Sequence, residues 1–336
     1  MLIVGTMIGA GFCSGRELVS FFGSGISVFV APLCGACIFF VCVLFLCIGT
    51  KIREKSFDKV NGVLLGKYHF IADVFLLVNN FIVLSAMIAG FNSLCKPFVP
   101  FPVCGTAAAV VCAVIASKGA KGMLDCNFAI VPFLIAALAA VCVCGLRSGE
   151  LSASMGVLRW RILPVGIVYV SMNMMLASTV LTTIGELTRK QIVAGSAIAA
   201  VCIAALMTLL ITALNCTGNY EAEMPLLEIS ASGGKWLYLL LGIVTGVSIF
   251  TTMLTAVGGL CGYLNDKGGG KIFHASVVVL AGTLLSLVGF SRVVSLFYPL
   301  VGLLGLAYIV FCLRYMRQAT KKPVRDLREQ DGRVFR

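Results

Sequence analysis

Charged residues are scarce in this chain of 336 residues. Asp, Glu, Lys and Arg make up 12% of it, whereas soluble domains carry about 25%. Hydrophobic residues make up 60% of the chain, and its mean hydropathy is +1.04. Such a chain has too little polar surface to fold as a globular domain in water. It is therefore predicted to be an all-α, polytopic membrane protein.

Histidine is also scarce, and the cysteines do not occur in paired spacings. The only histidines are His69 and His274, and the 15 cysteines stand singly among Val, Ala and Leu. We interpret these cysteines as small buried apolar residues rather than as metal ligands or disulfides. Paired carboxylates within the apolar runs and a Gly-x-x-x-x-Gly-Lys-Ser/Thr loop are absent as well. We therefore expect neither an enzyme nor an ATP-driven pump, and no cofactor other than a coupling ion.

Long runs of apolar residues make up most of the sequence. About 20 apolar residues cross a hydrocarbon core of about 30 Å, and ten runs meet that length. They divide into two sets of five at the loop around residues 146–161. Because five is odd, the second set must run with the opposite orientation, which is the pattern of an inverted repeat. The predicted spans are 1–22, 27–50, 70–94, 101–117, 125–146, 162–185, 190–214, 236–264, 272–290 and 293–316.

The domain organisation follows from these spans. We predict a single transmembrane domain over 1–316, with repeats at 1–146 and 162–316, and a basic cytoplasmic tail at 317–336. Most Lys and Arg residues fall in loops that are cytoplasmic when the N-terminus is cytoplasmic, so both termini are expected inside. The net charge is +12, and we interpret the basic tail as a topology anchor beside anionic lipid in a bacterial plasma membrane. Nucleic-acid binding is not expected, and the oligomeric state is left open.

The first span is unusual because it is rich in glycine and ends in charge. Its glycines are Gly5, Gly9, Gly11 and Gly15. Arg16 and Glu17 follow, and we interpret them as an ion pair. Backbone groups freed at membrane depth are tolerated only where they line a cavity or a ligand, so we predict that this helix is discontinuous. The alternative is that the glycines merely allow close helix packing.

The sixth span is its counterpart in the second repeat. Ser171 and Asn173 are polar at its centre, and we predict a second discontinuity there. The alternative is a continuous helix with one buried asparagine bonded to a neighbour. Asn79 and Asn80 in the third span either face a central cavity or join neighbouring helices, and we favour the second reading. The acidic loop before the eighth span either caps the protein or is simply exposed.

The eighth span carries hydroxyl groups on one face. Ser248, Thr251, Thr252 and Thr255 recur at intervals of three and four residues. Such oxygens can bind a small cation beside an opened helix. The alternative is that they bond back to carbonyls of their own helix.

With these residues in hand, the chain resembles the YkvI family of bacterial membrane proteins. That family is related to the amino acid–polyamine–organocation superfamily, which has the leucine-transporter fold. The resemblance covers essentially the whole chain and implies a 5+5 inverted repeat with substrate held between discontinuous helices 1 and 6. The segments that carry it are residues 5–12, 171–173, 184–186, 248–252 and 286–291.

The resemblance also implies particular site residues. The implied Na⁺ site uses the carbonyls of Gly5, Ile8 and Ser248 with the side chains of Thr251 and Thr252. The implied substrate contacts are Gly9, Ala10, Gly11, Phe12, Ser171 and Asn173.

The expected function is secondary active transport of a small polar solute, an amino acid or related amine, coupled to Na⁺ or H⁺. Only eight residues precede Gly9, so a second function stays open. It is a non-transporting membrane sensor or structural protein that retains the fold.

Overall fold

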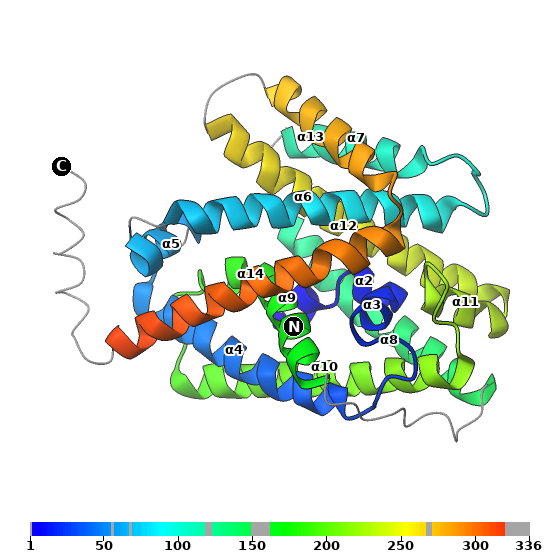
Figure 1. Ribbon diagram of the computed structural model, residues 1–336, viewed down its shortest axis with the longest axis horizontal. Helices are drawn as coiled ribbons and strands as arrows, with labels where there is room; N and C mark the ends of the chain where they lie inside the picture. Colours follow the sequence, from blue (N-terminus) through cyan, green and yellow to red (C-terminus); the bar gives the residue numbers. More distant parts are fainter. Residues whose placement is uncertain are drawn as a thin grey trace.

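The computed structural model describes residues 2–54, 57–66, 69–117, 123–148, 162–266 and 271–319. Regular secondary structure in these ranges is helical (Figure 1). Most of the predicted basic tail, from residue 320 onward, lies outside the described residues, as do several of the basic loop residues.

The helices match the predicted spans closely. The first span consists of α1 (Leu2–Met7), α2 (Ala10–Ser14) and α3 (Arg16–Phe22). The other spans are α4 (Val30–Ile52), α6 (His69–Cys95), α7 (Cys104–Ser117), α8 (Met123–Ser148), α9 (Ile162–Leu181), α10 (Arg189–Thr217), α12 (Lys235–Asp266), α13 (Lys271–Ser286) and α14 (Phe290–Ala319). Two short helices, α5 (Phe57–Leu65) and α11 (Pro225–Ser232), lie between spans.

The lengths of these helices suit a membrane. Six of the described helices are long and apolar enough to cross a bilayer, and three further apolar helices are shorter. Many large apolar side chains on them are exposed, such as Phe40, Phe133 and Ile198. Exposure of those side chains to water would be unfavourable, whereas lipid solvates them. The chain is a multi-pass membrane protein.

The helices pack with an internal symmetry. Many of the contacts between helices are preserved when each of the first five spans is exchanged with its counterpart in the second five, although those of α2 with α12 and of α3 with α14 have no counterpart of comparable extent. Thus α4 packs against α9 while α10 packs against α1, and α8 packs against α12 while α14 packs against α6. The two short helices also correspond to each other. Helix α5 follows α4 in the first repeat and α11 follows α10 in the second, and they lie at opposite ends of the bundle (Figure 1). An inverted 5+5 repeat produces this pattern.

The predicted break in the first span is confirmed. The Ile8 amide still donates to the Val4 carbonyl (2.9 Å), and the Cys13 amide donates to the Gly9 carbonyl (3.0 Å). Between them Gly9 is extended, with φ −91° and ψ −179°. The chain therefore leaves the helix at Ile8 and re-enters it at Ala10. A second change of direction follows at Gly15, whose φ of 75° favours glycine.

The predicted interruption of the sixth span is wrong. Helix α9 is continuous from Ile162 to Leu181. Its central polar groups are satisfied without unwinding: the Asn173 side-chain amide donates to the Tyr169 carbonyl (3.1 Å). The Ser171 hydroxyl is within hydrogen-bond distance of the carbonyls of Val168 (2.8 Å) and Gly302 (2.5 Å). Because no glycine or proline stands between Gly166 and Leu181, nothing in the sequence opens this helix.

Glycines instead bring α14 against α9. A β-carbon at Gly302 would lie 2.5 Å from the Val168 carbonyl oxygen, and one at Gly305 would lie 2.5 Å from that of Ser171. Small residues at such positions let two membrane helices approach closely. The second repeat therefore presents a continuous helix to the broken helix of the first.

Candidate functional site

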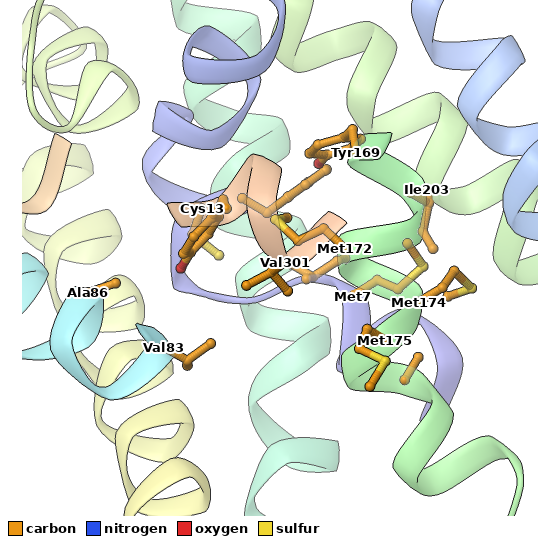
Figure 2. Packing of buried hydrophobic residues seen from close by; sticks show 14 of the residues in the cluster. Met7, Cys13, Val83, Ala86, Tyr169, Met172, Met174, Met175, Ile203 and Val301 are labelled. Carbon is orange, nitrogen blue, oxygen red and sulfur yellow. The ribbon is translucent and has the colours of Figure 1, made fainter. Parts of the chain in front are cut away.

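A small cavity lies beside the break in the first span. Its volume is about 40 Å³. This is enough for a few atoms, since one water molecule needs a volume of about 10–15 Å³. Figure 2 shows Met7, Met172 and Val301 close together on one side, with Val83 on α6 across from them. The lining residues are Met7, Gly9, Gly11, Glu17, Asn79, Val83, Met87, Met172, Asn173, Leu176, Thr252, Tyr298 and Val301.

Glu17 brings a carboxyl group to this cavity. The side chain belongs to α3 and is only 6% exposed. Its Oε2 has no hydrogen-bond partner among the residues that the structure describes. The carboxylate lies over Gly11, where a β-carbon would collide with it. The glycine after the break therefore makes room for an acid that reaches back to the break.

Asn79 contributes a second unpartnered group. It lies on α6, is 2% exposed, and its Nδ2 also has no partner within the described part of the chain. The neighbouring Asn80 has a different role, because its amide packs against Gly259 on α12. Each of the two alternatives considered for this pair therefore holds for one residue: Asn79 faces the cavity, and Asn80 joins neighbouring helices.

Arg16 does not pair with Glu17, contrary to expectation. Adjacent residues on a helix do not face each other, and the Arg16 guanidinium turns toward the loop after α10. Its Nη1 donates to the carbonyls of Tyr220 (2.9 Å) and Ala222 (3.1 Å). In the same loop, the Glu223 carboxylate accepts a hydrogen bond from the Ser93 hydroxyl on α6 (2.6 Å). The loop is thus tied to both α3 and α6, as a cap would be.

The substrate contacts implied by the resemblance divide into two groups. Gly9, Gly11 and Asn173 line the cavity. Phe12 is 2% exposed and lies in the apolar core, outside the cavity lining. Ser171 is also outside it, because its hydroxyl bonds to backbone on α9 and α14. Ala10 begins α2 directly after the break.

The residues of the implied Na⁺ site come from α1 and the residue after it and from α12, and Met7 of α1 lines the same cavity as Thr252 of α12. Helix α12 packs against α2, and Thr252 lines the cavity. The hydroxyls of Thr251 and Thr252 both donate to the Ser248 carbonyl, at 3.1 Å and 2.8 Å. Ile8 is buried at the end of α1, and Gly5 packs against Val131 on α8. A sodium site here stays a prediction.

Sequence reasoning missed Glu17 and Tyr298 as cavity residues and favoured the other role for Asn79. A signal for Glu17 existed, since an ionisable residue inside a span usually marks a functional site. It was assigned instead to an ion pair with its neighbour. For Tyr298, one aromatic residue in an apolar helix gives no such signal.

Comparison with known proteins places these features in context. No protein-family model matches the chain. Two relatives from Bacillus subtilis (strain 168) are each 25% identical to it. One is the uncharacterized membrane protein YkvI, matched over 326 residues, 91% of this chain and 92% of the relative. The other is the uncharacterized protein YyaD, matched over 329 residues, 93% and 94% respectively. The resemblance expected from the sequence is confirmed.

Two solved structures share the fold. MhsT in complex with L-phenylalanine has a TM-score of 0.62 at 15% identity, covering 88% of this chain and 78% of MhsT. The inward-facing conformation of Mhp1 has a TM-score of 0.64 at 13% identity, covering 92% and 75%. This likeness establishes the leucine-transporter type of fold.

Proposed function

We propose that the protein is a secondary active transporter of a small polar solute, an amino acid or a related amine. The observation that carries this proposal is the break at Gly9, which faces a cavity lined by spans of both repeats. Transporters with inverted repeats bind their substrates at the interface of the repeats, near a discontinuous helix. A helix that served only as an anchor would have no reason to open there.

The chemistry of the cavity suits a polar solute. The carbonyl end of α1 and the amide end of α2 meet at Gly9, so both donors and acceptors are available. The amide of Asn173 and the hydroxyl of Thr252 add side-chain contacts. An amino acid is also the ligand in the MhsT complex, which supports the same class of cargo here.

Transport requires that the cavity open to each side of the membrane in turn. We propose that the loop held by Arg16 closes one side, and that Na⁺ or H⁺ drives the cycle. For Na⁺, the ligands are the carbonyls of Gly5, Ile8 and Ser248 with the hydroxyls of Thr251 and Thr252. We further propose a bacterial plasma membrane location with both termini in the cytoplasm.

Uptake by proteoliposomes tests this function directly. Purified protein is reconstituted, a Na⁺ or H⁺ gradient is imposed, and accumulation of radiolabelled amino acids and amines is measured. We expect accumulation above that of empty liposomes under one of the two gradients. Solute binding without accumulation under either gradient would identify a sensor that retains the fold.

A further inference from the structure

We propose that Glu17 is the anchor for a monovalent cation in this cavity, either the ammonium group of the cargo or the coupling ion. The inference deepens the proposed function, on which it rests, by naming the charge that the cavity receives. It uses a residue that the resemblance does not assign to any site.

The charge of the cavity points to a cation. Glu17 is the one charged side chain among the residues that line the cavity in the described part of the chain. An ionised carboxylate removed from water is costly unless it is paired. The nearest candidate in sequence is Arg16, but its guanidinium is bonded to the carbonyls of Tyr220 and Ala222.

The elements packed against α3 do not supply a positive charge either. The elements in substantial contact with α3 are α2, α9 and α14. The titratable groups on them that face Glu17 within the described residues are the Cys13 thiol and the hydroxyls of Tyr169 and Tyr298. All three groups are neutral when protonated, and none becomes a cation. No side chain that faces Glu17 within the described residues can therefore neutralise its ionised form, and a cationic ligand is the partner that we propose for it.

A second unpartnered atom defines the rest of the ligand. The Asn79 Nδ2 is a hydrogen-bond donor without an acceptor in the described structure, on the same cavity as Glu17. A small molecule with an ammonium group and an oxygen satisfies both residues, whereas sodium satisfies the carboxylate alone. The volume of about 40 Å³ restricts the group held in this conformation to a few heavy atoms. Amino acids and amino alcohols combine these features.

Matched probes can separate the two sources of positive charge. The purified full-length protein is titrated with ethanolamine hydrochloride or with ethylene glycol, which replaces the ammonium by a neutral hydroxyl. Parallel titrations compare NaCl with KCl at equal ionic strength. The readout is the midpoint of thermal unfolding, from which an apparent Kd is obtained. Glu17→Gln removes the charge and keeps the shape, and Glu228→Gln removes an exposed carboxylate on α11 as the control.

We expect the wild-type protein to be stabilised by ethanolamine or by Na⁺, and not by ethylene glycol or K⁺. Glu17→Gln should weaken the apparent affinity about tenfold or more, because it removes a charged hydrogen bond, while Glu228→Gln leaves it unchanged. Stabilisation by ethanolamine identifies the cargo amine as the source, and stabilisation by Na⁺ alone identifies the coupling ion. Without ligand, Glu17→Gln should unfold at the same temperature as the wild type or higher, since an unpaired buried charge has been removed.

Two results would overturn the inference: no stabilisation of the wild type by either cation, or full stabilisation of Glu17→Gln. A lower ligand-free midpoint for Glu17→Gln would indicate a structural role instead. The proposed transport function and the cation site can be rejected independently of each other. Binding that depends on Glu17 without any uptake by liposomes rejects transport and keeps the cation site. Uptake that is unchanged in Glu17→Gln rejects the cation site and keeps transport.

Discussion

The Glu17 carboxylate occupies the space that a β-carbon on Gly11 would fill. This contact joins two features of the first span, its glycine-rich break and its buried acid, into one site. It also gives the glycine a role distinct from that of Gly9, where the added β-carbon would meet no atom within 4 Å. Gly9 forms the break, whereas Gly11 admits the acid.

Gly11→Ala is therefore expected to displace Glu17 from the cavity. The obstructed atoms are the end of a flexible side chain, so the fold should survive while the carboxylate moves away. We expect apparent cation affinity to fall about tenfold or more, as for Glu17→Gln. Titration followed by thermal unfolding measures the change. Gly195→Ala is the control, because its β-carbon would enter open space on α10. Unchanged cation binding in Gly11→Ala would contradict the contact.

Much of the fold could be predicted from the sequence because lipid imposes a simple rule. A helix that crosses the bilayer must be long and apolar, so each run of such residues after the first gave one helix. The break at Gly9 was also predictable, since glycine lowers the cost of leaving the helix. By contrast, the polar residues at the centre of α9 were ambiguous. Asn173 was satisfied by its own helix, and the sequence carries no mark of that.

The orientation of side chains around the cavity could not be predicted. In a helix that is apolar all round, periodicity does not show which face is turned inward. Asn79 and Asn80 are adjacent and identical, yet one lines the cavity and the other packs against Gly259. Arg16 and Glu17 are adjacent and of opposite charge, which suggested a pair. Their helical geometry sends them to different surroundings instead.

Arg16→Gln is expected to loosen the loop between α10 and α11. The guanidinium makes two hydrogen bonds to carbonyls of that loop, and a charged hydrogen bond contributes about 1.5–3 kcal/mol. Losing even one corresponds to a tenfold or greater rise in local opening. Amide hydrogen exchange of residues 218–224 measures this opening. Arg292→Gln, which removes an exposed arginine on α14, should leave the exchange unchanged. Equal protection in the two variants would show that Arg16 does not hold the loop.

Gly302→Ala tests the close approach of α14 to α9. A β-carbon there would lie 2.5 Å from the Val168 carbonyl oxygen and 2.6 Å from the Val168 Cγ1. Because backbone must move to relieve the contact, we expect a loss of about 1–3 kcal/mol in the free energy of unfolding. Thermal or denaturant unfolding in detergent measures it. Gly195→Ala again serves as the control and should be as stable as the wild type or more so. If Gly302→Ala has the same free energy of unfolding as the wild-type protein, the two helices are farther apart than described.

Thr252→Val tests the predicted sodium site. Valine keeps the shape of threonine but removes the hydroxyl, which lies on the cavity and donates to the Ser248 carbonyl. If the hydroxyl binds Na⁺, its removal should lower the apparent affinity for Na⁺ about tenfold or more in the uptake assay. Thr255→Val is the matched control, because that hydroxyl is exposed and bonds to the Thr251 carbonyl. Sodium-stimulated uptake that is equal in both variants would place the ion elsewhere and leave Glu17 as the cation-binding group of the cavity.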